Sequence, residues 1–167
     1  MEIIYREAEL SDSASLIEFL KTVGGETDNL SFSAESLKLT PESEERFLKR
    51  FKSNGKNLML VAEYNGKIVG NASIERNKIP RFSHRAELSV AVVSEFWGCG
   101  IGSELCRRLI DFAKSTGAEI IYLEARADNE RAISLYRKIG FKPLGIYENF
   151  FKINNKYYDA MLMTLQI

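Results

Sequence analysis

Three glycines stand at alternate positions in "WGCGIG", residues 97–102, between a strand-like run and a helix-like run. A glycine-rich turn of this kind often binds phosphate, because the helix N-terminus offers unpaired N–H groups and a partial positive charge. The spacing differs from the G-x-x-x-x-G-K-[ST] of nucleotide P-loops and from the G-x-G-x-x-G of dinucleotide-binding proteins. The stretch therefore indicates either a phosphate site of another class or a tight turn whose glycines let helix and strand pack.

A carboxylate upstream of the glycines is suited to proton transfer. Glu87 lies in "RAELSVAVV", where strand alternation places it on one face with Ser89 and Ala91. These small neighbours leave room for a ligand beside the carboxylate, so we expect Glu87 to act as a general base. An ion pair with Arg85 or Arg126 is the alternative interpretation.

A phenol downstream of the glycines is the candidate proton donor. The pKa of Tyr136 as a free phenol lies near that of a thiol, so it can protonate a thiolate. The residue also belongs to an apolar helical stripe in which it would simply be buried, formed by Ala132, Ile133, Leu135, Tyr136 and Ile139. Asn129 precedes this stripe and is suited to cap the helix.

Alternating strands and helices are predicted to position these residues. We expect strands over 3–8, 56–64, 67–76, 85–93 and 119–127, two more within 142–167, and helices over 11–23, 41–52, 102–117 and 129–140. Asn65-Gly66 and Asn154-Asn155 are expected at hairpin turns. This order predicts one α/β domain over residues 1–167, with a mixed, mostly antiparallel seven-stranded sheet and about four helices.

The composition excludes several classes of function. The 167 residues include 23 Lys and Arg and 23 Asp and Glu, and a zero net charge gives no electrostatic basis for binding nucleic acid. No apolar run approaches the roughly 20 residues of a membrane span, and the acidic N-terminus lacks a signal-peptide pattern. Two cysteines without metal-ligand spacing and a single histidine, His84, predict a reduced, cytoplasmic protein without a metal site.

Two segments resemble the signature motifs of the GNAT superfamily of acyl-CoA-dependent N-acyltransferases. "LSVAVVSEFWGCGIGSELCRRLIDFAK" matches the Q/R-x-x-G-x-G/A pattern after a hydrophobic strand, except that Trp97 stands where Arg or Gln is usual. "LEARADNERAISLYRKIGFKPLG" resembles the second signature, in which an Asn opens a helix and a Tyr lies seven residues later. The hairpin before the first motif and the paired strands at the end also match the family order, so the resemblance covers nearly the whole chain.

The resemblance implies a GNAT-like fold, acetyl-CoA as cosubstrate and no metal. It assigns the pyrophosphate to the backbone of Gly98, Cys99, Gly100, Ile101, Gly102 and Ser103, and the pantetheine arm to the backbone of Val92 and Val93. It makes Asn129 a cofactor contact, makes Tyr136 a cofactor contact and the general acid, and supports Glu87 as the base. Arg107 or Arg108 is expected to compensate for the charge that Trp97 lacks.

The implied reaction is direct acetyl transfer, in a ternary complex, to a primary amine of a small molecule or a peptide N-terminus. Glu26 and Asp28 are expected to line the acceptor site and to attract a cationic amine, with a solvated acidic loop as the alternative. A non-catalytic acyl-CoA-binding or sensing module would keep the glycine loop and need neither Glu87 nor Tyr136.

A kinase or other nucleotide-binding protein is a third alternative, and the lack of a Lys-Ser or Lys-Thr pair after the glycines argues against it. The motifs do not distinguish one acceptor amine from another. The last two strands either present a free edge or pair across a homodimer.

Overall fold

The chain forms seven strands and four helices, which the computed structural model describes over all 167 residues. The strands are β1 (Ile4–Glu7), β2 (Leu58–Tyr64), β3 (Lys67–Arg76), β4 (Arg85–Val92), β5 (Ile120–Arg126), β6 (Lys142–Ile153) and β7 (Lys156–Gln166). The helices are α1 (Ser13–Glu26), α2 (Pro41–Lys52), α3 (Ile101–Ser115) and α4 (Glu130–Ile139), with 3-10 turns at Leu10–Asp12, Pro80–Phe82 and Ser94–Phe96.

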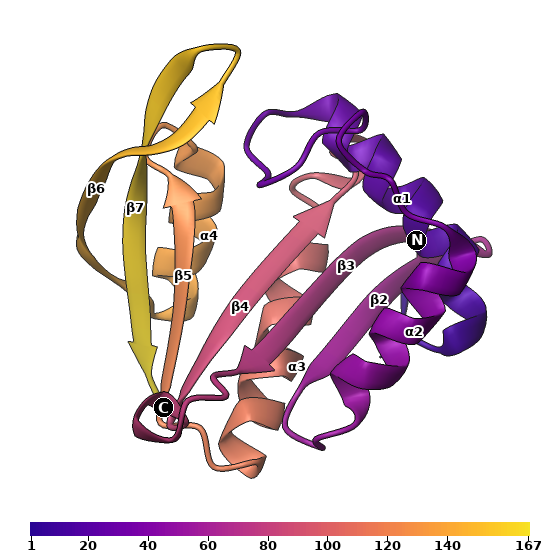
Figure 1. Ribbon diagram of the computed structural model, residues 1–167, viewed down its shortest axis with the longest axis horizontal. Helices are drawn as coiled ribbons and strands as arrows, with labels where there is room; N and C mark the ends of the chain where they lie inside the picture. The colour runs from indigo at the N-terminus through magenta and orange to yellow at the C-terminus, as the bar shows by residue number, and fades with distance from the viewer.

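All seven strands belong to one sheet, in the order β1-β2-β3-β4-β5-β7-β6 (Figure 1). Every neighbouring pair is antiparallel except β4 and β5, which run parallel. The prediction of one α/β domain with a mixed, mostly antiparallel sheet of seven strands and four helices is therefore confirmed.

The two asparagine turns have the backbone conformation that tight hairpins need. Asn65 and Gly66 both have positive φ, at 49° and 75°, and Asn154 and Asn155 have φ of 49° and 62°. Positive φ at both central residues is the requirement of a type I′ turn, and asparagine and glycine reach this region at low cost. Both predicted hairpins, β2–β3 and β6–β7, are present.

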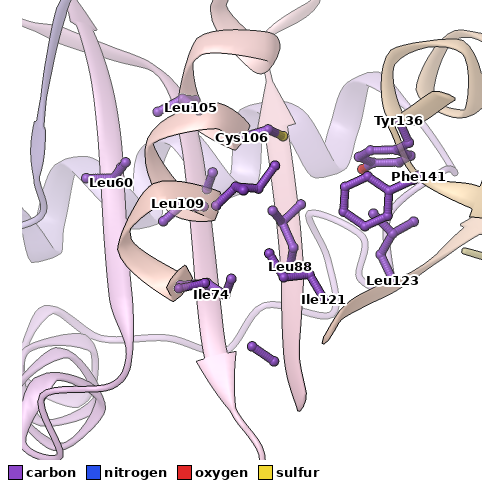
Figure 2. Packing of buried hydrophobic residues seen from close by; sticks show 14 of the residues in the cluster. Leu60, Ile74, Leu88, Leu105, Cys106, Leu109, Ile121, Leu123, Tyr136 and Phe141 are labelled. Carbon is purple, nitrogen blue, oxygen red and sulfur yellow. The ribbon is translucent and has the colours of Figure 1, made fainter. Parts of the chain in front are cut away.

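The main hydrophobic core lies between the sheet and α3. Leu105, Cys106 and Leu109 of α3 face strand residues such as Leu60 and Ile74 (Figure 2). These α3 positions repeat at helical spacing, so one side of the helix is apolar and packs on the sheet.

A second, smaller core covers the opposite face of the sheet, under α1 and α2 (Figure 1). It contains Ala8, Leu16, Leu48, Phe51, Met59 and Val61. Since alternate residues of a strand face opposite sides, Met59 and Val61 contact this core while their neighbours contact α3. Asn71 and Ser73 of β3 pair with Val61 and Met59 and therefore share this face.

The first helix differs from the prediction at its C-terminal end. The sequence placed a loop from Gly24, but α1 continues through Gly24 and Gly25 to Glu26. A Cβ atom on Gly24 would lie 2.9 Å from the backbone nitrogen of Ala34. This glycine therefore allows the following loop to cross close to the helix, and it does not end the helix.

The parallel strands β4 and β5 separate along their length. They pair only from Arg85–Ile120 to Glu87–Tyr122, after which β4 follows β3 and β5 follows β7 (Figure 1). The N–H of Val93 donates to the carbonyl of Val69 on the β3 side. Because backbone groups alternate in direction along a strand, those of Val90 and Val92 point into the space between β4 and β5.

The strand at the sheet edge, β6, is irregular. Its pairing with β7 shifts register between Pro143 and Gly145 and again between Tyr147 and Phe151. Inside the second shift, Asn149 has φ of 55°, and its N–H donates to Asp159 Oδ1 at 2.9 Å. The residues that follow therefore leave the regular alternation of a strand.

Candidate active site

A cleft of about 670 Å³ begins where β4 and β5 separate and extends under α1 and α2. Its floor is the sheet face that carries Ser73, Glu87 and Ser89. Its walls come from α1, α2, α4 and β6. The cleft therefore joins segments that lie far apart in the sequence, and it contains several of the predicted site residues.

Glu87 lies on the floor of this cleft and makes no ion pair. The two predicted partners are engaged elsewhere: the Arg85 guanidinium lies 4.5 Å from the ring centroid of Tyr122, and Arg126 pairs with Asp128 at 2.6 Å. The alternative interpretation of Glu87 as an ion-paired strand residue is therefore wrong, and the carboxylate is free to meet a ligand.

The surroundings of Glu87 favour its protonated form. Partial burial raises the pKa of the carboxyl group above its ordinary value, and the nearby carboxylates of Glu124 and Glu75 raise it further. Glu75 is directly opposite Glu87 on β3. A raised pKa brings a carboxylate closer to the strength of an efficient general base at neutral pH.

Tyr136 is both a core residue and a cleft residue. It is only 6% exposed, and its ring centroid lies 5.7 Å from that of Phe141 (Figure 2). Burial raises the pKa of the phenol, with a further contribution from Cys106 of α3, and no hydrogen bond from the protein offsets this. The same residue lines the cleft at the separation of β4 and β5. Core packing and proton donation are therefore compatible here.

The three glycines serve different geometric needs. Gly98 and Gly100 have φ of 79° and 82°, and a Cβ on either would meet no atom within 4 Å. A Cβ on Gly102 would lie 3.3 Å from Leu135 Cδ2 of α4. The first two glycines thus form the turn, and the third lets α3 and α4 approach each other.

The N-terminus of α3 is uncapped. Gly100 is the N-cap residue and supplies no side-chain hydrogen bond. The first backbone N–H that forms a helical hydrogen bond is that of Glu104, which donates to the carbonyl of Gly100. The N–H groups of Ile101, Gly102 and Ser103 are therefore available to an anion. The Ile101 side chain is buried in the core, so only its backbone can serve this role.

Trp97 occupies the position where the resembled motif has Arg or Gln. Its Nε1–H donates to the carbonyl of Val92 at 2.7 Å, and the guanidinium of Arg131 lies 3.8 Å from its ring centroid. Both Trp97 and Arg131 line the cleft. An arginine from the first turn of α4 thus brings a positive charge to the place that the motif arginine would serve.

The predicted compensation by α3 arginines is wrong. Arg107 and Arg108 both pair with Glu104 one turn earlier, and Arg108 also lies over the ring of Tyr5. Neither arginine lines the cleft. Arg108 thus lies against Tyr5 of β1, whereas Arg131 lies against Trp97.

Two other predicted cofactor contacts have backbone partners within the protein. Val93 donates its N–H to Val69 and accepts at its carbonyl from Phe96, so neither group is free to pair with a ligand. Val92 lines the cleft and keeps its N–H free, while Trp97 occupies its carbonyl. We therefore correct the predicted backbone pairing at Val93: only Val92 offers such a group.

The remaining predicted cofactor residues are distributed around the helix starts. Asn129 lines the cleft and caps α4, with its side chain accepting from the Ala132 N–H at 3.3 Å. Cys99 is exposed in the glycine turn, but its N–H donates to the carbonyl of Phe96 at 3.3 Å, so the predicted backbone contact at Cys99 is corrected. Cys106 is buried in α3, where burial raises the pKa of its thiol to about 12.

The structure does not bring Glu26 and Asp28 to the cleft. Both carboxylate oxygens of Glu26 accept hydrogen bonds from Ser94, one from its N–H at 2.8 Å and one from its hydroxyl at 3.0 Å. Glu26 therefore ties the end of α1 to the turn that follows β4. Their neighbours Thr27, Asn29 and Leu30 line the cleft instead.

The sequence analysis missed several cleft residues. They are Glu44 of α2, Glu124 of β5, Arg131 of α4, and Phe150 and Phe151 of β6. Two consecutive phenylalanines reach one cleft because the register shift before Phe151 interrupts the alternation of β6. One signal could have revealed Glu44: it is a charged residue at a position of the predicted second helix that faces the core.

The structure contains neither a cluster of metal-binding side chains nor a helix suited to span a membrane. No group of three or more His, Cys, Asp or Glu side chains is arranged to hold a metal ion. None of the helices combines the length and the apolar character that crossing a bilayer demands.

Known proteins resemble this chain in sequence. N-alpha-acetyltransferase RimI of Mycobacterium tuberculosis is 35% identical over 103 residues, which are 61% of this chain and 61% of that protein. L-amino acid N-acetyltransferase AaaT of Escherichia coli is 33% identical over 106 residues, which are 63% of this chain and 65% of that protein. The matches thus span less than two thirds of these curated relatives.

A solved structure and a family model extend the similarity. The crystal structure of an acetyltransferase of GNAT family from Streptococcus pneumoniae is 34% identical, covers 99% of this chain and 100% of its own, and has a TM-score of 0.95. The model of the acetyltransferase (GNAT) family matches residues 27–141, more than half of the sequence. The chain therefore belongs to the acetyltransferase (GNAT) family.

Proposed function

We propose that the protein transfers the acetyl group of acetyl-CoA to a primary amine by direct attack in a ternary complex. One observation carries the proposal: a single cleft is lined by Gly102 at the start of α3, by Tyr136 and by Glu87. An anion-binding helix start, a proton donor and a proton acceptor therefore meet where β4 and β5 separate. A relative that acetylates L-amino acids and a relative named for an N-alpha-acetyltransferase support the reaction class.

The residues at the helix starts fit the cofactor. The N–H groups of Gly98 and of Gly100 to Ser103 would hold the pyrophosphate, and the open space at Gly98 and Gly100 lets its oxygens approach the backbone. Arg131 adds a positive charge beside them. The free N–H of Val92 would pair with the pantetheine arm, and Asn129 would contact it from the start of α4.

The chemistry needs a neutral amine, a stabilised oxyanion and a proton for the leaving sulfur. Glu87 accepts a proton from the acceptor ammonium, directly or through water, so that the nitrogen lone pair can attack the thioester carbonyl. The N–H of Val90, which also points into the space between β4 and β5, faces the developing oxyanion. As the C–N bond forms and the C–S bond breaks, Tyr136 gives its proton to the thiolate, which leaves as free coenzyme A. The nitrogen then loses its extra proton, through water, to the tyrosinate, which restores the phenol, and Glu87 returns its proton to solvent.

Turnover of acetyl-CoA against a panel of amines, amino acids and short peptides tests this proposal, with free thiol release as the readout. We expect thiol release that depends on the amine and is lost in a Glu87→Gln, Tyr136→Phe double variant. Thermal stabilisation by acetyl-CoA with no turnover on any amine would favour the non-catalytic binding module. Stabilisation by Mg-ATP and not by coenzyme A would favour a nucleotide-binding protein.

We propose a small-molecule amine or a peptide N-terminus as the acceptor. The printed names of relatives include acetyltransferases of L-amino acids and of the alanine of ribosomal protein bS18. Two free cysteines, one exposed and one buried, fit a reducing compartment, so we place the reaction in the cytoplasm. A homodimer through the last two strands stays a prediction; β6 is an outer strand with exposed apolar side chains, among them Leu144 and Tyr147.

Replacing Arg131 with Gln is expected to raise KM for acetyl-CoA about tenfold, because a charge-assisted contact to phosphate is lost. The value of kcat should change little, since Arg131 lies beside Trp97 and not beside Glu87. Steady-state kinetics with varied acetyl-CoA measures both constants. Arg137→Gln, an exposed arginine later in the same helix, is the matched control. An unchanged KM in Arg131→Gln would contradict the role of Arg131.

A further inference from the structure

A carboxylate occupies a core-facing position of α2. The buried residues of this helix are Glu44, Leu48 and Phe51, which lie on one side of the helix at the spacing of successive turns. Leu48 and Phe51 pack in the smaller core, whereas Glu44 lines the cleft. The Glu44 residue is only 5% exposed, so its carboxylate faces the cleft and not the outer surface.

The Glu44 carboxylate has no partner in the protein. No side chain pairs with it or donates a hydrogen bond to it, and burial alone raises its pKa above the ordinary value. The other carboxylates of the cleft are Glu87 and Glu124, and its arginine, Arg131, is held at the Trp97 end. A carboxylate in a largely buried wall without a counter-charge is unfavourable, so a cationic ligand that enters the cleft would stabilise its charged form.

The cleft between Glu44 and Glu87 is apolar along its wall. Leu16 and Leu20 of α1 and Phe47 of α2 line the cleft. On the floor, Met59 of β2 pairs with Ser73 of β3, and Ser73 pairs with Ser89 of β4. Met59, which lies under α2, and Ser89, on the same strand as Glu87, are therefore two strand spacings apart, roughly 10 Å.

We propose that Glu44 binds a second cationic nitrogen of the acceptor, joined by an apolar spacer to the amine that is acetylated. This inference rests on the proposed acetyl transfer and names its substrate class. The reacting amine lies beside Glu87, the spacer packs against the apolar wall, and the distal cation pairs with Glu44. Such an acceptor supplies the counter-charge that the protein itself lacks.

Kinetics with matched amines tests the assignment. The probes are α,ω-diaminoalkanes of four to eight carbons and 1-aminoalkanes of the same lengths. In the unmodified protein we expect KM for the best diamine to be about tenfold lower than for its monoamine. Glu44→Gln should remove this difference by raising KM for the diamine about tenfold relative to KM for the monoamine. Glu42→Gln, an exposed glutamate of the same helix, should keep the preference.

A binding measurement separates the two proposals. Calorimetric titration with 1,6-diaminohexane should show binding to the unmodified protein and at least tenfold weaker binding to Glu44→Gln. Turnover of monoamines with no preference for any diamine overturns the Glu44 assignment and leaves the proposed function intact. Lack of thiol release with every amine overturns the proposed function, and diamine binding that still depends on Glu44 would support the cation site on its own.

Discussion

Glu87→Gln is expected to lower kcat about 100-fold near neutral pH, the typical size of a lost general base. The amide has the same shape as the carboxylate but cannot accept the proton of the acceptor ammonium. KM for acetyl-CoA should stay within about twofold, because the proposed role of Glu87 is to take a proton from the acceptor amine and not to hold the cofactor. Steady-state thiol release measures both constants.

The pH dependence gives a second readout for Glu87. Its pKa is raised by burial and by the carboxylates of Glu124 and Glu75, so the basic form exists only above this raised value. The rate should therefore fall as the pH drops through a pKa higher than that of an ordinary glutamate. Glu75→Gln removes one of these charges outside the cleft and should move this acid limb to lower pH without changing the plateau. A Glu87→Gln variant with full activity would contradict the assignment.

Tyr136→Phe is expected to lower kcat about 100-fold while leaving the melting temperature unchanged or raising it. The Tyr136 side chain is largely buried and lines the cleft, and its hydroxyl makes no hydrogen bond within the protein, so its removal costs no protein contact. The ring, which packs beside Phe141, is retained in the variant. Thermal unfolding and kinetics on the same preparation give both values.

The two interpretations of Tyr136 predict opposite outcomes for this variant. A residue that only packs in the core would keep full activity as phenylalanine. A proton donor loses turnover without losing stability. Tyr64→Phe is the matched control, because Tyr64 packs its ring against Phe96 outside the cleft. Normal kcat in Tyr136→Phe would mean that the thiolate leaves unprotonated or takes its proton from water.

Local sequence signals predicted most of the fold. Asn65-Gly66 and Asn154-Asn155 marked hairpins because few residues tolerate positive φ. The apolar periodicity of α3 identified the face that packs on the sheet. The predicted end of α1 was wrong because Gly24 does not end the helix. A glycine is needed there because the backbone of Ala34 passes close by, and local sequence rules do not include such tertiary contacts.

The site could be predicted only where a motif carries it. Glu87, Tyr136 and the glycine motif stand in recognisable segments, and the structure brings Glu87, Tyr136 and Gly102 to one cleft. Contacts between distant segments left no such pattern. Glu26 bonds Ser94, 68 positions later, and Arg131 stacks on Trp97 from another helix. The positive charge beside Trp97 therefore comes from Arg131 of α4, and the sequence around Trp97 gives no sign of it.

The irregularity of β6 also bears on solubility. A free edge strand of 12 residues would ordinarily offer a backbone template on which other chains could add strands and aggregate. The two register shifts and Pro143 divide its pairing with β7 into runs of two, three and three residues. None of these runs is long enough to seed a regular ladder. The same bulge that brings Phe150 and Phe151 to the cleft thus keeps the outer edge of the sheet from growing.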